Sequence, residues 1–365
     1  MSIRVDNPAT LFDWLHKNDV RYVVLRDFDG LSISAGENVQ IDDLDLLVED
    51  GAIPDLATQF KTTRSPDGIK CDLYGVRGEH GSDYHGHAHL PEELGERILQ
   101  QRQLSATGVY VPDDEGYLRS LLYHLSYHKN IQSGFHWDDS SMATNSPHRR
   151  TVQGLLQSLD VKLEFTHQAF DAYLRDAGYG VTPERLNAYI QHDFHHHRKS
   201  LAHARIADRQ PGEMNLFVVR KIAVKKRKDG ELLEKIRDQY RVIASKPITW
   251  SRRISTRKQM RGGKWRRGGH PYIAVVVFDP SPIPSSEEQR AIHPFVFNAR
   301  QFIKPQWRDW FVAETGVKAT ANPIHSTDNE AEAIGHLPLF FDADEQQQIF
   351  RDVDALRTKL PEHVT

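Results

Sequence analysis

An alternation of acidic and apolar residues at 41–48 constrains the fold of this chain more than any other feature. The segment reads Ile-Asp-Asp-Leu-Asp-Leu-Leu-Val, a pattern that predicts a β-strand. Because side chains alternate between the faces of a strand, Asp43 and Asp45 are expected on one face and the apolar residues on the other. Two adjacent carboxylates repel each other, and a divalent cation such as Mg²⁺, which prefers oxygen ligands, relieves this repulsion. The alternative is an edge strand whose acids face water.

A third acid, Asp72, lies in a second apolar run at 69–76, which predicts a neighbouring strand. A helical segment at 53–60 separates the two strands. Upstream, a helix that begins after Asn7 is followed by a strand at 21–26. A metal held by such acids commonly serves phosphoryl or nucleotidyl transfer, because it neutralises charge on the transferring phosphate.

This order of elements, with Asp-x-Asp on one strand and a third acid on the next, resembles the nucleotidyltransferase superfamily over about residues 8–130. The likeness is to a divergent branch among bacterial polysaccharide and cell-envelope biosynthesis proteins, in which a Leu-Arg strand end precedes the Asp-x-Asp strand. It implies a mixed sheet and a nucleotide triphosphate as donor. It also implies that Asp43, Asp45 and Asp72 hold Mg²⁺, and that Asp72 activates an acceptor hydroxyl.

The sequence departs from that superfamily after its first strand, where a Gly-Gly or Gly-Ser pair normally holds the terminal phosphates. Here the position reads Leu-Arg-Asp-Phe-Asp-Gly at 25–30. Arg26 is expected either to clamp a phosphate of the nucleotide, since its planar fork suits phosphate oxygens, or to pair with the neighbouring acids.

A second motif follows a predicted buried strand at 272–278. The segment from Asn322 reads Asn-Pro-Ile-His-Ser-Thr-Asp-Asn and continues into an Ala-bearing stretch that ends in Leu-Phe-Phe. Over about 272–341 the chain resembles nucleoside diphosphate kinases, whose active-site segment runs Asn-x-x-His-Gly-Ser-Asp-Ser. The resemblance implies that His325 is a nucleophile that becomes phosphorylated, with Asn322, Thr327 and Asp328 around the nucleotide.

Two alternatives for this segment stay open. It is either a degenerate nucleotide-binding segment or a helix N-cap beside which His325 sits. In each case we expect His325 in a surface cleft, next to a helix that begins near Thr327 or Asp328, because free helix amides and the helix dipole make an anion site.

Histidines are abundant, and two groups of them suggest ligand binding. His85, His87 and His89 alternate in one segment, which predicts three imidazoles on one face of an extended strand. This face is expected to bind a transition metal or to contact a substrate phosphate.

The second group, His124 and His128, lies one helical turn apart. This spacing is that of zinc peptidases, but leucine stands where their glutamate base belongs. The alternatives are a half-buried aromatic helix face, or a pocket for an anionic nucleotide or substrate that His128 and Lys129 line.

Basic residues are concentrated at 246–267, which holds nine Lys or Arg and no acid although the net charge of the chain is −3. Such a stretch, with glycines and Trp265 interleaved, is expected to bind nucleic acid, another anionic polymer or an anionic membrane surface. The alternative is an exposed, partly ordered linker, or a face that docks onto the acidic N-terminal domain.

Composition, 39% hydrophobic and 27% charged over 365 residues, describes a globular protein. The order of elements and the resemblance to nucleotidyltransferases imply the α+β class. We expect a nucleotidyltransferase-like domain at 1–130, a helical domain at 151–245, a basic linker at 246–270 and a small α/β domain at 271–365. The longest apolar run is far below the roughly 20 residues that span a bilayer. With no signal-peptide core and a single cysteine, Cys71, a cytoplasmic protein is expected.

These observations favour a Mg²⁺-dependent nucleotidyl- or phosphotransferase that uses a nucleotide triphosphate and acts on a hydroxyl or phosphate acceptor. The alternative is an inactive transferase-fold module that holds nucleic acid or another anionic polymer through 246–267. If the chain is such a transferase, Asp45→Asn is expected to abolish its activity and to relieve like-charge repulsion between the acids.

Overall fold

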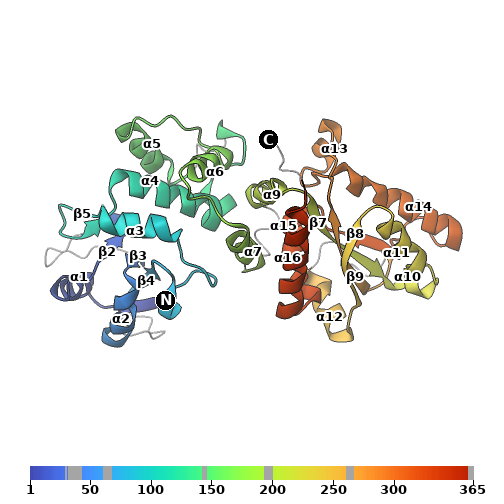
Figure 1. Ribbon diagram of the computed structural model, residues 1–365, viewed down its shortest axis with the longest axis horizontal. Coiled ribbons are helices and arrows are strands. Elements are labelled where there is room, and N and C mark those ends of the chain that lie inside the picture. The colour runs from blue at the N-terminus through green and yellow to red at the C-terminus, as the bar shows by residue number, and fades with distance from the viewer. Residues whose placement is uncertain are drawn as a thin grey trace. The chain divides into compact units, whose positions relative to one another are not determined.

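The computed structural model describes residues 1–28, 31, 43–60, 68–141, 146–192, 200–259 and 267–360. The chain divides into two compact units, Met1–Ala188 and Tyr189–Thr365. Each unit contains a four-stranded sheet and several helices (Figure 1), so the predicted α+β class is confirmed.

The sheet of unit 1 has the strand order β1-β4-β3-β2. Its strands are β1 (Ser2–Val5), β4 (Ile69–Gly75), β3 (Asp43–Val48) and β2 (Tyr22–Val24). The central pair, β3 and β4, is parallel, whereas both outer pairs are antiparallel. The predicted strands at 21–26, 41–48 and 69–76 therefore exist, but β1 was not predicted from the sequence.

Helices α1 (Pro8–Lys17) and α2 (Ile53–Gln59) follow β1 and β3 in the chain. The Asn7 side chain caps α1 by accepting a hydrogen bond from the Ala9 amide at 2.9 Å, as its position before a proline predicts. Leu11, Phe12 and Leu15 of α1 are buried in the core of unit 1. The first predicted helix is thus confirmed with its buried face.

The remaining part of unit 1 is mostly helical. In chain order it comprises α3 (Glu92–Gln100), the short pair β5 (Gln103–Leu104) and β6 (Tyr110–Val111), α4 (Asp114–Tyr123), α5 (Arg149–Ser158), α6 (His167–Asp176) and α7 (Pro183–His192). Asp113 caps α4, whose amide at Gly116 donates to it at 2.9 Å. Helices α5 and α6 pack against α4 (Figure 1). Beyond α4 the chain continues as a π-helical segment, His124–Lys129.

The sheet of unit 2 has the order β10-β7-β9-β8, with every neighbouring pair antiparallel. Its elements are α9 (Leu201–Asp208), β7 (Glu213–Arg220), α10 (Lys221–Lys225), α11 (Asp229–Arg237), β8 (Arg241–Pro247), α12 (Trp250–Gln259), β9 (Pro271–Asp279), α13 (Glu287–Ile292), α14 (Lys304–Thr315), β10 (Ile324–Ser326), α15 (Glu330–Phe340) and α16 (Ala343–Arg357). With α12 set aside, this is a β-α-β-β-α-β arrangement of the split βαβ type.

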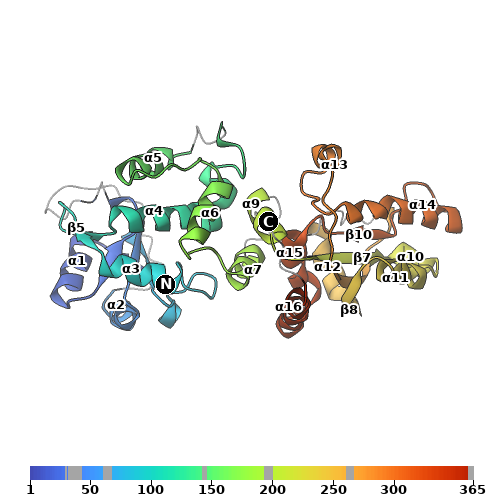
Figure 2. The same ribbon diagram turned by 45° about the horizontal axis from the view of Figure 1, so that its top comes forward.

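One face of this sheet carries a compact core. Phe217 and Val219 alternate along β7 and meet the side chains of α11 and α14, including Leu232 and Trp307. Figure 2 shows α10 and α11 next to each other, where they cover this part of the sheet. The strand β10, which carries His325, forms the edge of the sheet beside β7.

The predicted helical domain at 151–245 does not coincide with either unit. All eight residues of β7 are buried, and its Leu-Phe-Val-Val run packs on both faces, as in a strand covered by helices on both sides. A helix of this composition would bury its whole circumference, and β-branched residues favour the strand. Helices α5 and α6 instead belong to unit 1.

The basic stretch at 246–267 is only partly a connector. Lys246 lies in β8 and its ammonium donates to the Glu345 carboxylate of α16 at 2.5 Å. Residues 250–259 form α12, and the remaining part up to 266, with Trp265, lies outside the described residues. Nowhere in the described part of the chain does a helix combine the length and apolar character that crossing a bilayer requires.

Candidate functional site

The three acids predicted to hold a metal lie on one face of unit 1. In the parallel pairing of β3 with β4, Asp45 is the direct partner of Asp72, and Asp43 is the partner of Lys70. Asp43 and Asp45 are two residues apart in one strand, so they share a face, and paired positions of neighbouring strands share it too. We call Asp43, Asp45 and Asp72 the acidic site.

Two cations compensate part of this negative charge. Nη2 of Arg26, which is buried, donates to Oδ2 of Asp45 at 2.5 Å. Nζ of Lys70 donates to Oδ2 of Asp72 at 2.6 Å, and the Ser2 hydroxyl donates to the other oxygen of Asp72. Of the two roles predicted for Arg26, the structure shows the pairing with an acid.

The charge of the acidic site shifts the pKa values of neighbouring groups. Partial desolvation of its largely exposed carboxylate and then repulsion from Asp45 raise the pKa of Asp43 above its ordinary value. Burial, followed by the fields of the three acids, raises the pKa of the Cys71 thiol to about 12. Burial, and then the charges of Asp45 and Asp72, raise the pKa of the Tyr74 hydroxyl as well. The site therefore carries more negative charge than its cations neutralise.

The donor chemistry of the acidic site fits Mg²⁺, which prefers carboxylate oxygens. The positions fit less closely, because the described residues bring three potential ligand atoms within 4.8 Å of one another only at a histidine cluster elsewhere in unit 1. The three carboxylates thus do not meet in one coordination sphere while Arg26 and Lys70 hold two of them. Displacement of these cations by substrate phosphates would free the oxygens.

The burial of His128 and Lys129 does not support the pocket predicted for them. His128 is 8% exposed, whereas Lys129 is exposed. Burial lowers the pKa of His128 well below its ordinary value of 6.5.

The segment around His85 is a tight turn and not the predicted extended face. The amides and carbonyls of Tyr84 and His87 bond each other at 2.6 and 3.2 Å, and His85 and Gly86 both have positive φ, 55° and 82°. These are the features of a two-residue hairpin turn of the primed type. Because the turn reverses the chain, only His89 enters the interior, where it is 1% exposed.

In unit 2, His325 lines a pocket of about 230 Å³, which we call the His325 pocket. Lys304 and Arg308, one turn apart on α14, line the same pocket, as do His293 and Asp328. Nζ of Lys304 donates to the Ser326 hydroxyl at 2.6 Å. The expectation that His325 lies at a cleft and outside the core is met.

The other residues predicted around His325 have different roles. The helix after it begins at Glu330 and is capped by Asn329, whose side chain accepts from the Glu332 amide at 2.9 Å, so the predicted helix start near Thr327 or Asp328 is too early. Thr327 is fully buried, and its hydroxyl bonds the Leu216 amide and the Asn215 side chain at 3.0 Å. It joins β10 to β7 and cannot reach a nucleotide in this pocket.

Positive charge dominates the surroundings of the His325 pocket. Burial, then repulsion from Arg308, lowers the pKa of Arg220 to about 10. Burial also lowers the pKa of Arg308. Nε of Arg308 is buried and has no hydrogen-bond partner among the residues that the structure describes. A guanidinium donor in this state, as at Nε of Arg308, is suited to bind an anion such as phosphate.

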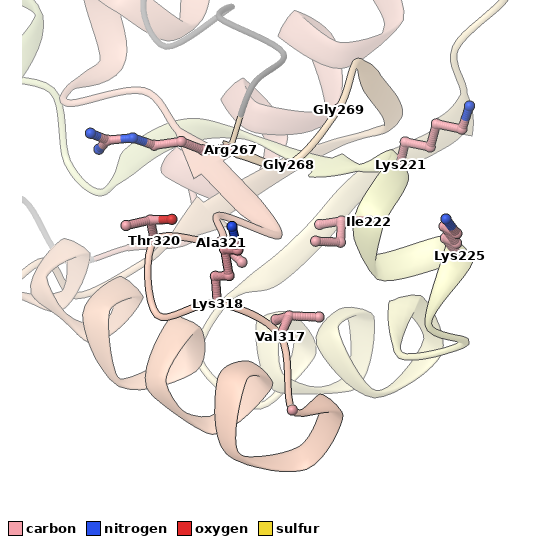
Figure 3. A pocket seen from close by; sticks show the side chains of 11 residues that line it. Lys221, Ile222, Lys225, Arg267, Gly268, Gly269, Val317, Lys318, Thr320 and Ala321 are labelled. Carbon is pink, nitrogen blue, oxygen red and sulfur yellow. The ribbon is translucent and has the colours of Figure 1, made fainter.

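Asn322 lies away from His325, next to a second basic pocket of about 610 Å³. This pocket is lined by Lys221, Lys225, Arg267 and Lys318 (Figure 3). At Gly268 a Cβ would stand 1.9 Å from the carbonyl oxygen of Asn322, so only glycine fits this close approach. Figure 3 shows the side chains of Lys221 and Arg267 directed away from each other, so the cations line the rim without converging on one point.

Three functional candidates were missed from the sequence. Lys70 stands two residues before Asp72, and strand alternation alone would have placed it beside the acids. Lys304 and Arg308 have the i, i+4 spacing of one helix face. Their proximity to His325, by contrast, depends on the packing of α14 beside β10, and no pattern of adjacent residues predicts it.

No model of a known protein family matches the chain, and no curated protein matches it in sequence. Among solved structures, the nucleoside diphosphate kinase of Aquifex aeolicus, in an orthorhombic crystal form, is similar with a TM-score of 0.24 and 16% identity. The similarity covers 37% of this chain and 98% of the kinase. A likeness this weak carries no argument about function, which has to come from the sites themselves.

Proposed function

We propose that unit 1 is a Mg²⁺-dependent nucleotidyl- or phosphotransferase of the nucleotidyltransferase type, with a nucleotide triphosphate as donor and a hydroxyl or phosphate group as acceptor. The observation that carries the proposal is the register of β3 and β4, which aligns Asp45 with Asp72 and sets Asp43 on the same face. The excess negative charge of this site supports a cationic occupant.

Each side chain has a role in this proposal. Asp43 and Asp45 hold the cation, which when bound neutralises charge on the transferring phosphate. Arg26 exchanges its carboxylate partner for phosphate oxygens, which its planar fork suits equally. Asp72 accepts the proton of the acceptor hydroxyl, and Lys70 keeps this carboxylate in place.

The test is incubation of the purified protein with labelled nucleotide triphosphates, with and without Mg²⁺, followed by separation of protein, polymer and small molecules. We expect a labelled small molecule or polymer that forms only with Mg²⁺. Asp43→Asn and Asp72→Asn should abolish the product. Asp55→Asn, which alters an exposed acid at the start of α2, is the matched control and should retain it. Equal activity of all four proteins would refute the assignment.

A second candidate function belongs to unit 2, where the His325 pocket combines an imidazole with Lys304 and Arg308. Here His325 would attack the terminal phosphorus of a nucleotide triphosphate, with loss of the nucleoside diphosphate and formation of a phosphohistidine. Label on the protein that survives base and is lost in acid would support it. His325→Ala should remove this label, whereas His293→Ala, in the same pocket, should keep it.

A further inference from the structure

Three histidines from two distant segments meet inside unit 1. His89 follows the tight turn, and His124 and His128 lie in the π-helical segment after α4. A ring nitrogen from each of the three lies within 4.8 Å of the other two. Each side chain is at most 8% exposed. We call these residues the histidine cluster.

One member of the histidine cluster, His89, has unsatisfied ring nitrogens among the described residues. Both ring nitrogens of His89 are buried and have no hydrogen-bond partner among the described residues. A neutral imidazole has one N–H donor and one lone pair, and burying either unmatched destabilises the fold. A metal ion would take up the lone pair.

The spacing within the cluster fits a tetrahedral ion. Nδ1 of His124 lies 3.4 Å from Nδ1 of His128, and the two rings cross at 84°. Two ligands at a Zn–N distance of about 2.05 Å in a tetrahedron are about 3.3 Å apart. A direct N–H···N hydrogen bond between these two nitrogens would be long at 3.4 Å. His89 and His128 face each other, with ring centroids 4.5 Å apart.

The surroundings hold the three rings in place. Tyr74 stacks on His89 at a centroid distance of 3.8 Å and an interplanar angle of 20°. Tyr84 contacts the edge of His89 and lies 4.3 Å from the centroid of His128. The π-helical turn is itself a rare conformation that recurs at functional sites.

We propose that His89, His124 and His128 form a transition-metal site, for which Zn²⁺ is the best match. Imidazole ligands select zinc and its neighbours over Mg²⁺ and Ca²⁺, which prefer oxygen. Three protein ligands leave the fourth tetrahedral position open for water or a substrate atom. The predicted metal site at His85, His87 and His89 thus keeps only its last member, which joins the pair at 124 and 128.

This site is distinct from the acidic site and independent of the proposed function. The two are neighbours through Tyr74, whose ring stacks on His89 and whose hydroxyl lies close to the Asp45 carboxylate. Their ligands differ in chemistry, nitrogen in one and oxygen in the other, so the metal that each would bind differs as well.

The experiment is a titration of the full chain, freed of metal by a chelator, with Co²⁺ alone and then with Zn²⁺ in competition. We expect one equivalent of Co²⁺ with the visible absorption of a tetrahedral site, displaced by one equivalent of Zn²⁺. His89→Gln, His124→Gln and His128→Gln should each weaken binding at least about 100-fold. His87→Gln, in the same turn but outside the cluster, should bind as the wild type does.

Failure of the wild type to bind one equivalent of Co²⁺ or Zn²⁺ would overturn the proposal. So would wild-type affinity in all three cluster variants, or equal loss in His87→Gln. If circular dichroism shows that a variant does not fold, the thermal midpoint of the wild type decides: Zn²⁺ should raise it and a chelator should reverse the rise. An unchanged midpoint at saturating Zn²⁺ counts against the site.

Discussion

The acidic site of unit 1 and the His325 pocket of unit 2 differ in the sign of their charge and in how that charge is compensated. At the acidic site each of two carboxylates has a cation within hydrogen-bonding distance, Arg26 on Asp45 and Lys70 on Asp72. In the His325 pocket the buried Nε of Arg308 has no partner among the described residues, and burial lowers the pKa of this side chain. The first site thus has ion pairs within the protein, whereas the second presents a buried N–H donor of a kind that suits an anion.

The largest expected effect comes from replacing Asp45, the carboxylate that bonds Arg26 and that we propose binds the metal ion. Asp45→Asn should lower transferase activity by about 1000-fold, because it removes a ligand that acts only with its neighbours. It should also destabilise unit 1 by about 2–3 kcal/mol, because Arg26 is buried and would lose its partner. The sequence alone suggested relief of repulsion here, and the ion pair reverses that expectation. Chemical denaturation measures the change, and a variant as stable as the wild type would show that Arg26 finds compensation elsewhere.

The next prediction concerns a buried acid of unit 2, Glu213, whose carboxylate oxygens have no hydrogen-bond partner among the described residues. Burial raises the pKa of Glu213 from 4.5 to about 8 in the folded protein. Its contribution to stability is therefore full below about pH 4.5 and is lost as pH rises through about 8, since the unfolded chain ionises more easily. The loss should be on the order of 3 kcal/mol. Glu213→Gln should abolish this pH dependence.

Denaturant midpoints at pH 5 and pH 8 measure that difference for the wild type and the variant. Glu287→Gln, which alters an exposed acid at the start of α13, should keep the pH dependence of the wild type. A wild type whose stability does not fall between these pH values would show that Glu213 is compensated in solution.

A smaller effect tests whether the His325 pocket binds an anion. Arg308→Ala should weaken binding of inorganic phosphate by about 10-fold, since it removes a charge-assisted contact of about 1.5 kcal/mol. Calorimetric titration checks this. Lys318→Ala, in the other basic pocket, is the control. If only the Lys318 variant loses phosphate binding, the anion site lies in the pocket of Figure 3.

The smallest effect separates the two acids of β3. Asp43 is exposed and repelled by its neighbours, and no cation bonds it among the described hydrogen bonds. Asp43→Asn should therefore raise the free energy of unfolding by about 0.5 kcal/mol, opposite in sign to Asp45→Asn, while activity is lost in both. Destabilisation by Asp43→Asn would contradict the excess of negative charge.

The elements of unit 1 could be predicted because their signals are local. The cap at Asn7, the buried face of α1 and the alternation of β3 each depend on a few adjacent residues. The placement of three acids on one face follows from alternation and a parallel pairing across a short helix. The features that the sequence analysis missed depend on contacts between distant parts of the chain. The strand β7 was mistaken for helix because a fully buried run has no alternation, and the histidine cluster joins two segments that only tertiary packing brings together.

The π-helical segment has a consequence for changes in chain length. A π turn holds one residue more than an α turn, and each residue of a regular helix turns the next by about 100°. Deleting one residue between His124 and His128 would let the segment close as a regular α turn and would leave these histidines three residues apart instead of four, which alters the spacing of their rings. Among homologous sequences, substitutions in this segment should therefore be tolerated more often than single-residue gaps.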